Sequence, residues 1–370
     1  MSTGRWTLLL ALLIFLGCNA DASSTHFPGY GPPPDQDLSY DAFRVDTVTG
    51  TTILDSTHVE NPYDLAVSAG RLFVLEQYPP PVLRVVEIGT WRVESQAGRQ
   101  GQGPGEVMVP WRVFVGPNGA PWIYDSGQRR IVRLYQIDTT GALRPDEETI
   151  NLESPFPIKS ISWLTDTTLV ANGFFDDERF GLFRADGKLL KHFGGVPEWP
   201  GPVALPFRNH FNEVEIAVHP SRELFVAAKR HTSEIEILDF DGKLKVLVKT
   251  PFDFRSSVNI TSTGQGYGLS WDSSWRQGYI DVAATEDRIF ALFSGRTLGR
   301  YGTDAAYGEY VHVFDWEGEL HRILRLDMDA FALAVEKNNS VFYTVSYDDA
   351  RPVVRRYELT SSGSLIVLSQ

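Results

Sequence analysis

Residues 112–125 read RVFVGPNGAPWIYD, two short apolar stretches on either side of a tight turn at Pro117-Asn118-Gly119. The second stretch, Trp122-Ile123-Tyr124, has no charged position. Short apolar runs bounded by Gly, Pro and Asn predict a β-hairpin. A strand that is apolar on both faces predicts a sheet that is covered on both sides.

The same hairpin pattern returns five more times along the chain. The first strands of these copies begin at Asp64, Ser160, Val214, Ile280 and Phe331, and the second strands at Leu72, Thr168, Leu224, Ile289 and Val341. A third strand follows each pair, and turns such as Asp186-Gly187 and Asp241-Gly242 lead into a fourth. A four-stranded antiparallel unit repeated about every 50 residues is typical of a propeller. The sequence therefore predicts an all-β fold over residues 41–370, a six-bladed β-propeller of four-stranded antiparallel blades.

A glycine-rich segment precedes the hairpin of residues 112–125. It reads Gly98-Arg99-Gln100-Gly101-Gln102-Gly103-Pro104-Gly105-Glu106, and Asp125-Ser126-Gly127-Gln128-Arg129-Arg130-Ile131 follows the hairpin. Glycines let the chain cross closely from one blade to the next, and Glu106 is expected to cap that turn by accepting backbone N–H bonds. A phosphate-binding loop is the alternative, but Pro104 and then a strand follow the glycines where such a loop needs a helix.

These residues, with Pro110 and the turn at 117–119, resemble an NHL repeat. They are also similar to the glycine-rich motif of the bacterial lipoproteins called six-bladed β-propeller proteins. The motif covers residues 98–134, and the looser blade pattern extends the resemblance over 43–370. Only the second blade matches closely, because the other blades keep the strands and turns but not the glycines.

The N-terminal residues differ from the rest of the chain. Arg5 is followed by the apolar run from Leu8 to Leu16, which is too short to cross a bilayer, and then by Gly17 and the only cysteine, Cys18. Residues 15–18 resemble a bacterial lipobox, although Phe stands at the first position in place of the more usual Leu. The resemblance implies a signal peptide over 1–17 and lipidation of Cys18. An ordinary secretory signal with an incidental cysteine is the alternative.

The predicted location is the cell envelope. Asn19 stands after the lipidated cysteine in place of the Asp that retains lipoproteins in the inner membrane of enteric bacteria, which favours the outer membrane over the inner. Residues 18–40 are rich in Ser, Asp, Gly and Pro and predict a partly extended tether. Residues 43–56 are expected to pack on the last blade and close the ring, although Leu365 to Leu368 also reads as the fourth strand of that blade.

The composition excludes some partners. The formal net charge is −13, and removal of residues 1–17, which contain Arg5 and no acidic residue, makes it −14. Nucleic acid and anionic headgroups require clustered positive charge, so the sequence predicts neither as a ligand. The 42% of hydrophobic residues suffices for a large core and excludes a disordered chain.

Catalytic signatures are scarce. The sequence has no His-Glu-x-x-His motif, no Gly-x-Ser-x-Gly elbow and no cysteine after Cys18, so we assign no catalytic residue, metal ligand or cofactor. The exits of the second strands carry Glu76, Asp125, Asn172, Ala228, Ser294 and Ser346. Oxygen atoms at these exits can ligate calcium, which keeps that ion open, but capping of the following turn is favoured.

Two function classes follow. The first is a non-catalytic binding or scaffold lipoprotein for a glycan, peptide or envelope protein. The second is an envelope hydrolase or lyase, with or without calcium, whose site lies at the mouth of the central channel.

An aromatic insertion points to the binding face. Residues 251–277 lengthen the spacing between two blades and carry Phe252, Phe254, Arg255, Tyr267, Trp271, Trp275 and Arg276. Arginines recur after five second strands, at Arg130, Arg179, Arg230, Arg296 and Arg351. We expect the insertion and these arginines to share one face and to contact an anionic or carbohydrate-containing partner. The alternative is that the aromatic rings cover a blade edge and the arginines pair with nearby Asp and Glu.

Overall fold

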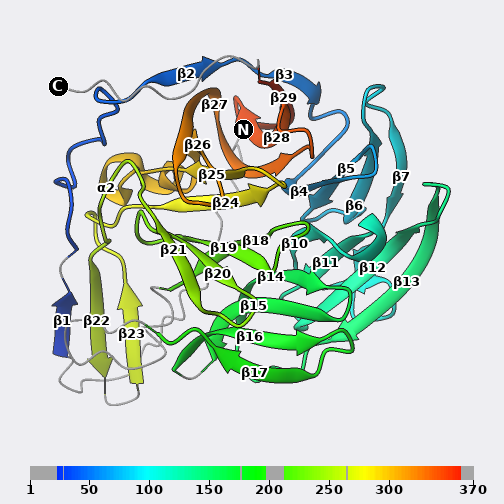
Figure 1. Cartoon of the computed structure of the whole chain (residues 1–370), viewed down its shortest axis with the longest axis horizontal. Helices are drawn as coiled ribbons and strands as arrows, with labels where there is room; N and C mark the ends of the chain where they lie inside the picture. Colours follow the sequence, from blue (N-terminus) through cyan, green and yellow to red (C-terminus); the bar gives the residue numbers. More distant parts are fainter. Residues whose placement is uncertain (1–22, 28, 176, 197–211, 264–265, 360–370) are drawn as a thin grey trace, which may run out of the picture.

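The computed structural model describes residues 23–27, 29–175, 177–196, 212–263 and 266–359. These residues form a ring of four-stranded antiparallel blades around a central axis (Figure 1). The predicted all-β propeller is therefore confirmed.

Blades one to four are separate sheets. Blade one contains β4 (Pro62–Ser68), β5 (Arg71–Glu76), β6 (Leu83–Glu87) and β7 (Val93–Ala97), and blade two β10 (Pro110–Val115), β11 (Pro121–Asp125), β12 (Arg130–Ile137) and β13 (Leu143–Asn151). Blade three contains β14 (Ile158–Thr165), β15 (Thr168–Phe175), β16 (Glu178–Arg184) and β17 (Leu189–Phe193), and blade four β18 (Val214–Val218), β19 (Leu224–Lys229), β20 (Ile235–Asp239) and β21 (Leu244–Val248). Every residue of β11 is buried, as expected for a strand without a polar face.

Blades five and six share one long strand. They contain β24 (Tyr279–Ala284), β25 (Ile289–Phe293), β26 (Gly308–Phe314), β27 (Leu320–Val335), β28 (Val341–Asp348) and β29 (Arg351–Glu358). The first part of β27, up to Arg325, pairs with β26 as the outer strand of blade five. Its last part, from Ala330, pairs with β28 as the inner strand of blade six. The two blades are thus joined without an intervening loop.

The N-terminal part of the chain closes the ring. β3 (Thr51–Leu54) pairs antiparallel with β29 and supplies the fourth strand of blade six, with Leu54 only 1% exposed. β2 (Val45–Val48) runs parallel to β27 on blade five. The predicted packing of residues 43–56 on the last blade is confirmed for β3, while Leu365 to Leu368 lies outside the described residues.

The hydrophobic core lies between the blades. Each of six buried clusters draws its residues from two neighbouring blades. Phe73 of blade one packs in one cluster with Ile123 of blade two, and Leu65 of blade one packs in another with Val345 of blade six. Because each blade is covered on both faces by its neighbours, its inner strands have no solvent-exposed face.

A smaller sheet stands outside the ring. We call it the outer sheet; it contains β1 (Ser23–Phe27), β22 (Val258–Thr263) and β23 (Gly266–Ser270), in the order β1-β22-β23 (Figure 1). The other short elements are β8 (Arg99–Gln100), β9 (Glu106–Val107), α2 (Leu298–Tyr301) and the 3-10 turns η1 (Pro117–Gly119) and η2 (Gly302–Ala306). None of the helices in the described part of the chain has the length and apolar character that a bilayer crossing requires.

Residues 29–40, which we call the strap, dock on the propeller. Their composition predicts an extended tether, yet Tyr30 pairs with Arg255 through two backbone hydrogen bonds of 3.0 Å. The guanidinium of Arg276 donates to the carbonyl oxygens of Pro33 at 3.0 Å and Gln36 at 2.9 Å. Arg276 is buried, so its N–H groups need acceptors, and the strap supplies them.

Candidate functional site

The innermost strands place one equivalent residue of each blade around the axis. These residues are Asp64, Arg112, Ser160, Glu215, Asp281 and Ala332. In every blade except blade four the residue follows an irregularity of register near the start of the strand. Such β-bulges redirect a side chain, and four of the six side chains here are charged.

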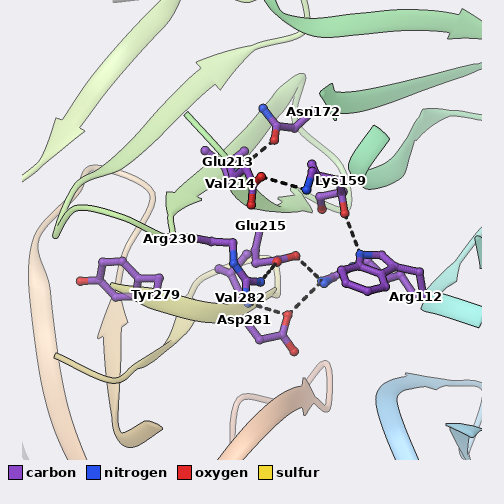
Figure 2. A network of polar contacts seen from close by, with 12 residues as sticks. Arg112, Lys159, Asn172, Glu213, Val214, Glu215, Arg230, Tyr279, Asp281 and Val282 are labelled. Carbon is purple, nitrogen blue, oxygen red and sulfur yellow. Dashed lines mark hydrogen bonds and ion pairs between the residues drawn. The ribbon is translucent and has the colours of Figure 1, made fainter. Parts of the chain in front are cut away.

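Arg112 links three blades through the centre of the ring. Its Nη1 donates to Glu215 Oε2 at 2.7 Å, and its Nη2 donates to Asp281 Oδ1 at 3.0 Å. Glu215 Oε1 also accepts from Arg230 Nη1 at 2.5 Å. Figure 2 shows these side chains converging, Arg112, Glu215 and Asp281 from separate strands and Arg230 from the loop after β19. We call Asp64, Arg112, Glu215, Arg230 and Asp281 the central network.

The two aspartates of the central network also join neighbouring blades. Asp64 of blade one accepts a hydrogen bond from the backbone N–H of Val113 of blade two at 2.8 Å. Asp281 of blade five accepts one from the N–H of Leu333 of blade six at 2.7 Å. The innermost strand is the edge of each sheet, so its N–H groups lack a partner within the blade. The carboxylates supply that partner and tie the blades together.

Burial sets the protonation of this network. Loss of hydration raises the pKa of Asp64 to about 7; Arg112 opposes that shift and Asp281 adds to it. Burial also raises the pKa of Glu215. For Arg112, burial alone would lower the pKa, but Asp281, Asp64 and Glu215 together hold it above its ordinary value. Three carboxyl groups thus surround a permanent cation, and burial holds the pKa values of Asp64 and Glu215 above their ordinary range.

Further polar contacts continue from the central network toward blade three. Lys159 Nζ lies 2.9 Å from Glu213 Oε1, and the carbonyl oxygen of Lys159 accepts from Trp111 Nε1 at 3.0 Å (Figure 2). Asn172 Oδ1 accepts from the backbone N–H of Val214 at 3.1 Å. These contacts again connect residues of different blades.

The predicted arginines occupy different environments. Arg130 donates to the carbonyl oxygen of Glu106 at 2.6 Å and pairs with Asp125 at 3.2 Å. Arg179 pairs with Glu236 at 2.7 Å, and Arg296 Nη2 donates to Asp329 Oδ1 at 2.9 Å. Arg230 belongs to the central network, and Arg351 is exposed at the start of β29. Pairing with acidic residues, the alternative for the arginines, holds for Arg130, Arg179, Arg230 and Arg296; their contact with a ligand stays a prediction.

The insertion is divided between two places. Trp271 stacks on His231 with ring centroids 4.9 Å apart, and Trp275 Nε1 donates to His231 Nδ1 at 3.3 Å. Both tryptophans are half-buried. The backbone N–H of Gln277 donates to Arg296 O, and that of Gly278 to Arg230 O. The base of the insertion therefore lies beside the loops that carry Arg230 and Arg296. Tyr267 lies instead on β23 of the outer sheet, and Arg276 anchors the strap.

The glycine-rich segment has a structural role. Glu106 accepts from the backbone N–H of Gly103 at 2.8 Å, so the predicted cap is confirmed. A Cβ at Gly101 would lie 2.0 Å from Glu106 Oε2, so a side chain there would displace the carboxylate that forms the cap. Asp125 accepts from the N–H groups of Met108 and Val109 at 2.9 and 3.0 Å.

The strand-exit residues cap backbone groups. Glu76 accepts from the N–H groups of Glu60 and Asn61, and Ser294 donates to the carbonyl oxygen of Ala305 at 2.7 Å. Asp125 also accepts from the N–H of Gly127 in the following turn at 3.2 Å, which is the capping favoured from the sequence, whereas Glu76 and the Oδ1 of Asn172 bind backbone groups of other segments. Over the ranges that the structure describes, no group of three or more His, Cys, Asp or Glu is placed to hold a metal ion.

The central network was not identified from the sequence. Its signal is present all the same, because Asp64, Arg112, Glu215 and Asp281 interrupt otherwise apolar strands at the equivalent position of four repeats. A charged residue at one such position alone indicates only a strand end that is exposed to solvent. Only the recurrence at the same place in several blades marks a common location near the axis.

Comparison with known proteins identifies the family. No curated protein matches the chain. Among solved structures, the RRP9 WD40 repeats align with a TM-score of 0.51 and 11% identity, covering 86% of this chain and 100% of that one. U3-55K aligns with a TM-score of 0.50 and 12% identity, covering 89% and 100%. At this identity the likeness concerns the fold alone. Residues 42–338 match a family described as TolB-like 6-blade propeller-like. The chain belongs to this TolB-like six-bladed propeller family.

Proposed function

We propose that this protein is a lipid-anchored propeller of the cell envelope that binds a glycan, peptide or envelope protein without transforming it. One observation carries the choice of binding over catalysis: the charged groups of the central network are engaged with each other and with the blades. Arg112 is held between Glu215 and Asp281, and Asp64 and Asp281 accept backbone N–H bonds. Groups held in this way stabilise the ring and leave recognition to its rim.

The rim beside Arg230 has the chemistry for recognition. The ring centroids of Trp271 and Trp275 lie 5.5 Å apart, and both side chains contact His231. The two tryptophans are close to the loops that carry Arg230 and Arg296. Flat rings stack on sugar faces or enter a pocket of a partner, and they dominate the binding energy of many interfaces. Arg230 and Arg296 pair with Glu215 and Asp329, so in this proposal the aromatic rings beside them carry the recognition.

The binding experiment uses the chain from residue 19 onward, without the anchor. An array of envelope-derived glycans and a pull-down from envelope extract identify the ligand, and titration gives its affinity. We expect Trp271→Ala with Trp275→Ala to weaken binding by about 30-fold, the effect of losing a hot spot. The control is Trp91→Ala, a half-buried tryptophan on blade one. Equal affinity of both variants and the native protein would exclude this rim as the binding face.

The anchoring part of the proposal has its own test. It rests on the lipobox resemblance of residues 15–18. Cells grown with a labelled fatty acid should incorporate the label into the protein, and Cys18→Ser should abolish it. Label retained in that variant, or absent from the native protein, would contradict lipidation at Cys18.

One observation favours a catalytic alternative. The raised pKa of Asp64 is typical of a carboxyl group that acts as a general acid near neutral pH. In this alternative, a hydrolase or lyase that binds at the channel mouth would lose turnover in Asp64→Asn and keep its ligand affinity. A calcium-dependent site would in addition raise the melting temperature when calcium is added. Binding of an envelope glycan without conversion would contradict it.

A further inference from the structure

The strand pairing of the outer sheet defines its two ends. β1 pairs antiparallel with β22, so that Ser23 lies opposite Ser262 and Phe27 opposite Val258. The β22–β23 pair ends with Thr263 opposite Gly266, whereas Val258 and Ser270 lead back toward the ring. Ser23, Ser262, Thr263 and Gly266 therefore share one end, which we call the distal end. Figure 1 shows the outer sheet extending beyond the blades, with β1 at its outside.

The outer sheet carries no formal charge in an acidic protein. Residues 22–34 and 256–271 contain no Asp, Glu, Lys or Arg, although the chain has 34 basic and 47 acidic residues. Because the charged residues are negative on balance, the rest of the protein taken as a whole is repelled by anionic lipid headgroups, whose potential falls off over about one Debye length, roughly 8–10 Å. The outer sheet is spared this repulsion.

The strap fixes the outer sheet to the ring. In addition to its bonds with Arg255 and Arg276, Pro34 O accepts from Thr297 Oγ1 at 2.8 Å, and Asp37 accepts from Tyr301 OH at 2.9 Å. Tyr40 then stacks on Tyr310 with ring centroids 4.0 Å apart. The described strap residues between β1 and β2 thus contact the propeller at several points along their length.

We propose that the distal end of the outer sheet rests on the headgroup layer of the membrane that holds the anchor, and so fixes the orientation of the propeller. The inference rests on lipidation of Cys18, part of the proposed function. Residues 19–22 separate Cys18 from Ser23. Five Cα steps of at most about 3.6 Å keep Ser23 within roughly 18 Å of the lipidated residue. The polar layer on each side of a bilayer is itself roughly 5–8 Å thick. The strap accordingly does not act as a spacer.

The experiment measures the distance of two labelled positions from the lipid surface. Lipidated protein, in which the acyl chains block Cys18, is reconstituted into vesicles of phosphatidylethanolamine and phosphatidylglycerol with nitroxide-labelled headgroups. A fluorophore is attached at Thr263→Cys, on the distal end, or at Thr139→Cys, an exposed control in the β12–β13 turn. We expect the nitroxide to quench the label at position 263 at least about twofold more strongly than the label at position 139, because quenching requires proximity to the headgroup layer.

Vesicle flotation separates the two ways to fail. If the protein does not float with the vesicles, the anchoring fails and the orientation fails with it. If it floats and both labels are quenched equally, the anchoring stands and the proposed orientation is overturned. Unchanged melting temperatures of both labelled variants ensure that the comparison concerns intact protein.

Discussion

The central network and the outer sheet differ in charge and in origin. The centre gathers Asp64, Arg112, Glu215 and Asp281 from the same position of four repeats; the three carboxylates are buried, and Arg112 pairs with two of them. Among the described residues no blade carries a counterpart of the outer sheet, which joins β1 to β22 and β23 without a formal charge. The repeat thus supplies the groups that hold the ring together. Departure from the repeat supplies the surfaces that are free to take a specific role.

The largest effect is expected at the centre of the ring. Arg112→Met removes the cation that Glu215 and Asp281 share and leaves buried carboxylates without their partner. Breaking one side of a buried ion pair costs about 3–5 kcal/mol of unfolding free energy. Urea denaturation of the native protein and the variant measures this difference.

A matched arginine on the surface provides the control. Arg325 pairs with Glu309 at 2.6 Å, but its side chain is 54% exposed. Arg325→Met should cost about 0–1 kcal/mol, because solvent screens the pair. Equal losses for Arg112 and Arg325 would show that the central network does not hold the blades together.

The second effect is a dependence of stability on pH. Asp64 has an ordinary pKa of 3.8 in the unfolded chain and about 7 in the folded protein, where burial disfavours the carboxylate. Between these values the folded state binds the proton and the unfolded state does not. The contribution of Asp64 to stability is therefore fully present below pH 4 and is lost as the pH rises toward 7, by at most about 1.4 kcal/mol per unit.

Asp64→Asn removes this titration. The unfolding free energy of the native protein minus that of the variant should fall steadily between about pH 4.5 and pH 7. The two oxygens of Asp64 accept from the backbone N–H groups of Leu65 and Val113. Asparagine has only one such oxygen, so the variant also loses one hydrogen bond, and this loss does not follow the titration of Asp64. A difference that stays constant over this range would mean that Asp64 titrates near its ordinary value.

The smallest effect is expected where the strap meets the ring. Tyr40 OH lies 2.9 Å from His312 Nε2, and Tyr279 OH lies 3.0 Å from His312 Nδ1. Burial lowers the pKa of His312 to about 3, so its imidazole is neutral. One imidazole nitrogen then donates a hydrogen bond to one tyrosine hydroxyl, and the other nitrogen accepts a hydrogen bond from the second hydroxyl. Tyr40→Phe leaves one nitrogen unpaired and should cost about 1 kcal/mol.

The effect of Tyr40→Phe is measured by thermal unfolding and by the rate at which a protease cleaves the strap. Tyr310→Phe is the control, since it keeps the ring that stacks on Tyr40. Strap cleavage that is equally slow in both variants would show that aromatic stacking, and not the hydrogen bond to His312, holds the strap.

The propeller was predictable because its signals are local. Strands such as Trp122-Ile123-Tyr124 are apolar on both faces, and the turns between strands carry residues that tolerate tight backbone geometry. The pattern that predicts each blade therefore lies within a short stretch of sequence. The cap by Glu106 spans three residues and was predicted for the same reason. The Pro-rich composition of the strap also reads locally, and it predicted a tether. It gave no hint of Arg276, which lies 243 residues from Pro33 and takes that carbonyl as its acceptor.

The sequence by itself determined the number and kind of blades, because strand periodicity and turn chemistry depend on neighbouring residues. Only the tertiary structure decided which charges meet: Arg112 binds Glu215 across 103 residues and Asp281 across 169. It also decided where the N-terminal segment lies, with β3 closing blade six and β1 joining the outer sheet. Closure of the ring brings these charged residues together, and the low dielectric of its interior strengthens their pairing and raises the pKa values of Asp64 and Glu215.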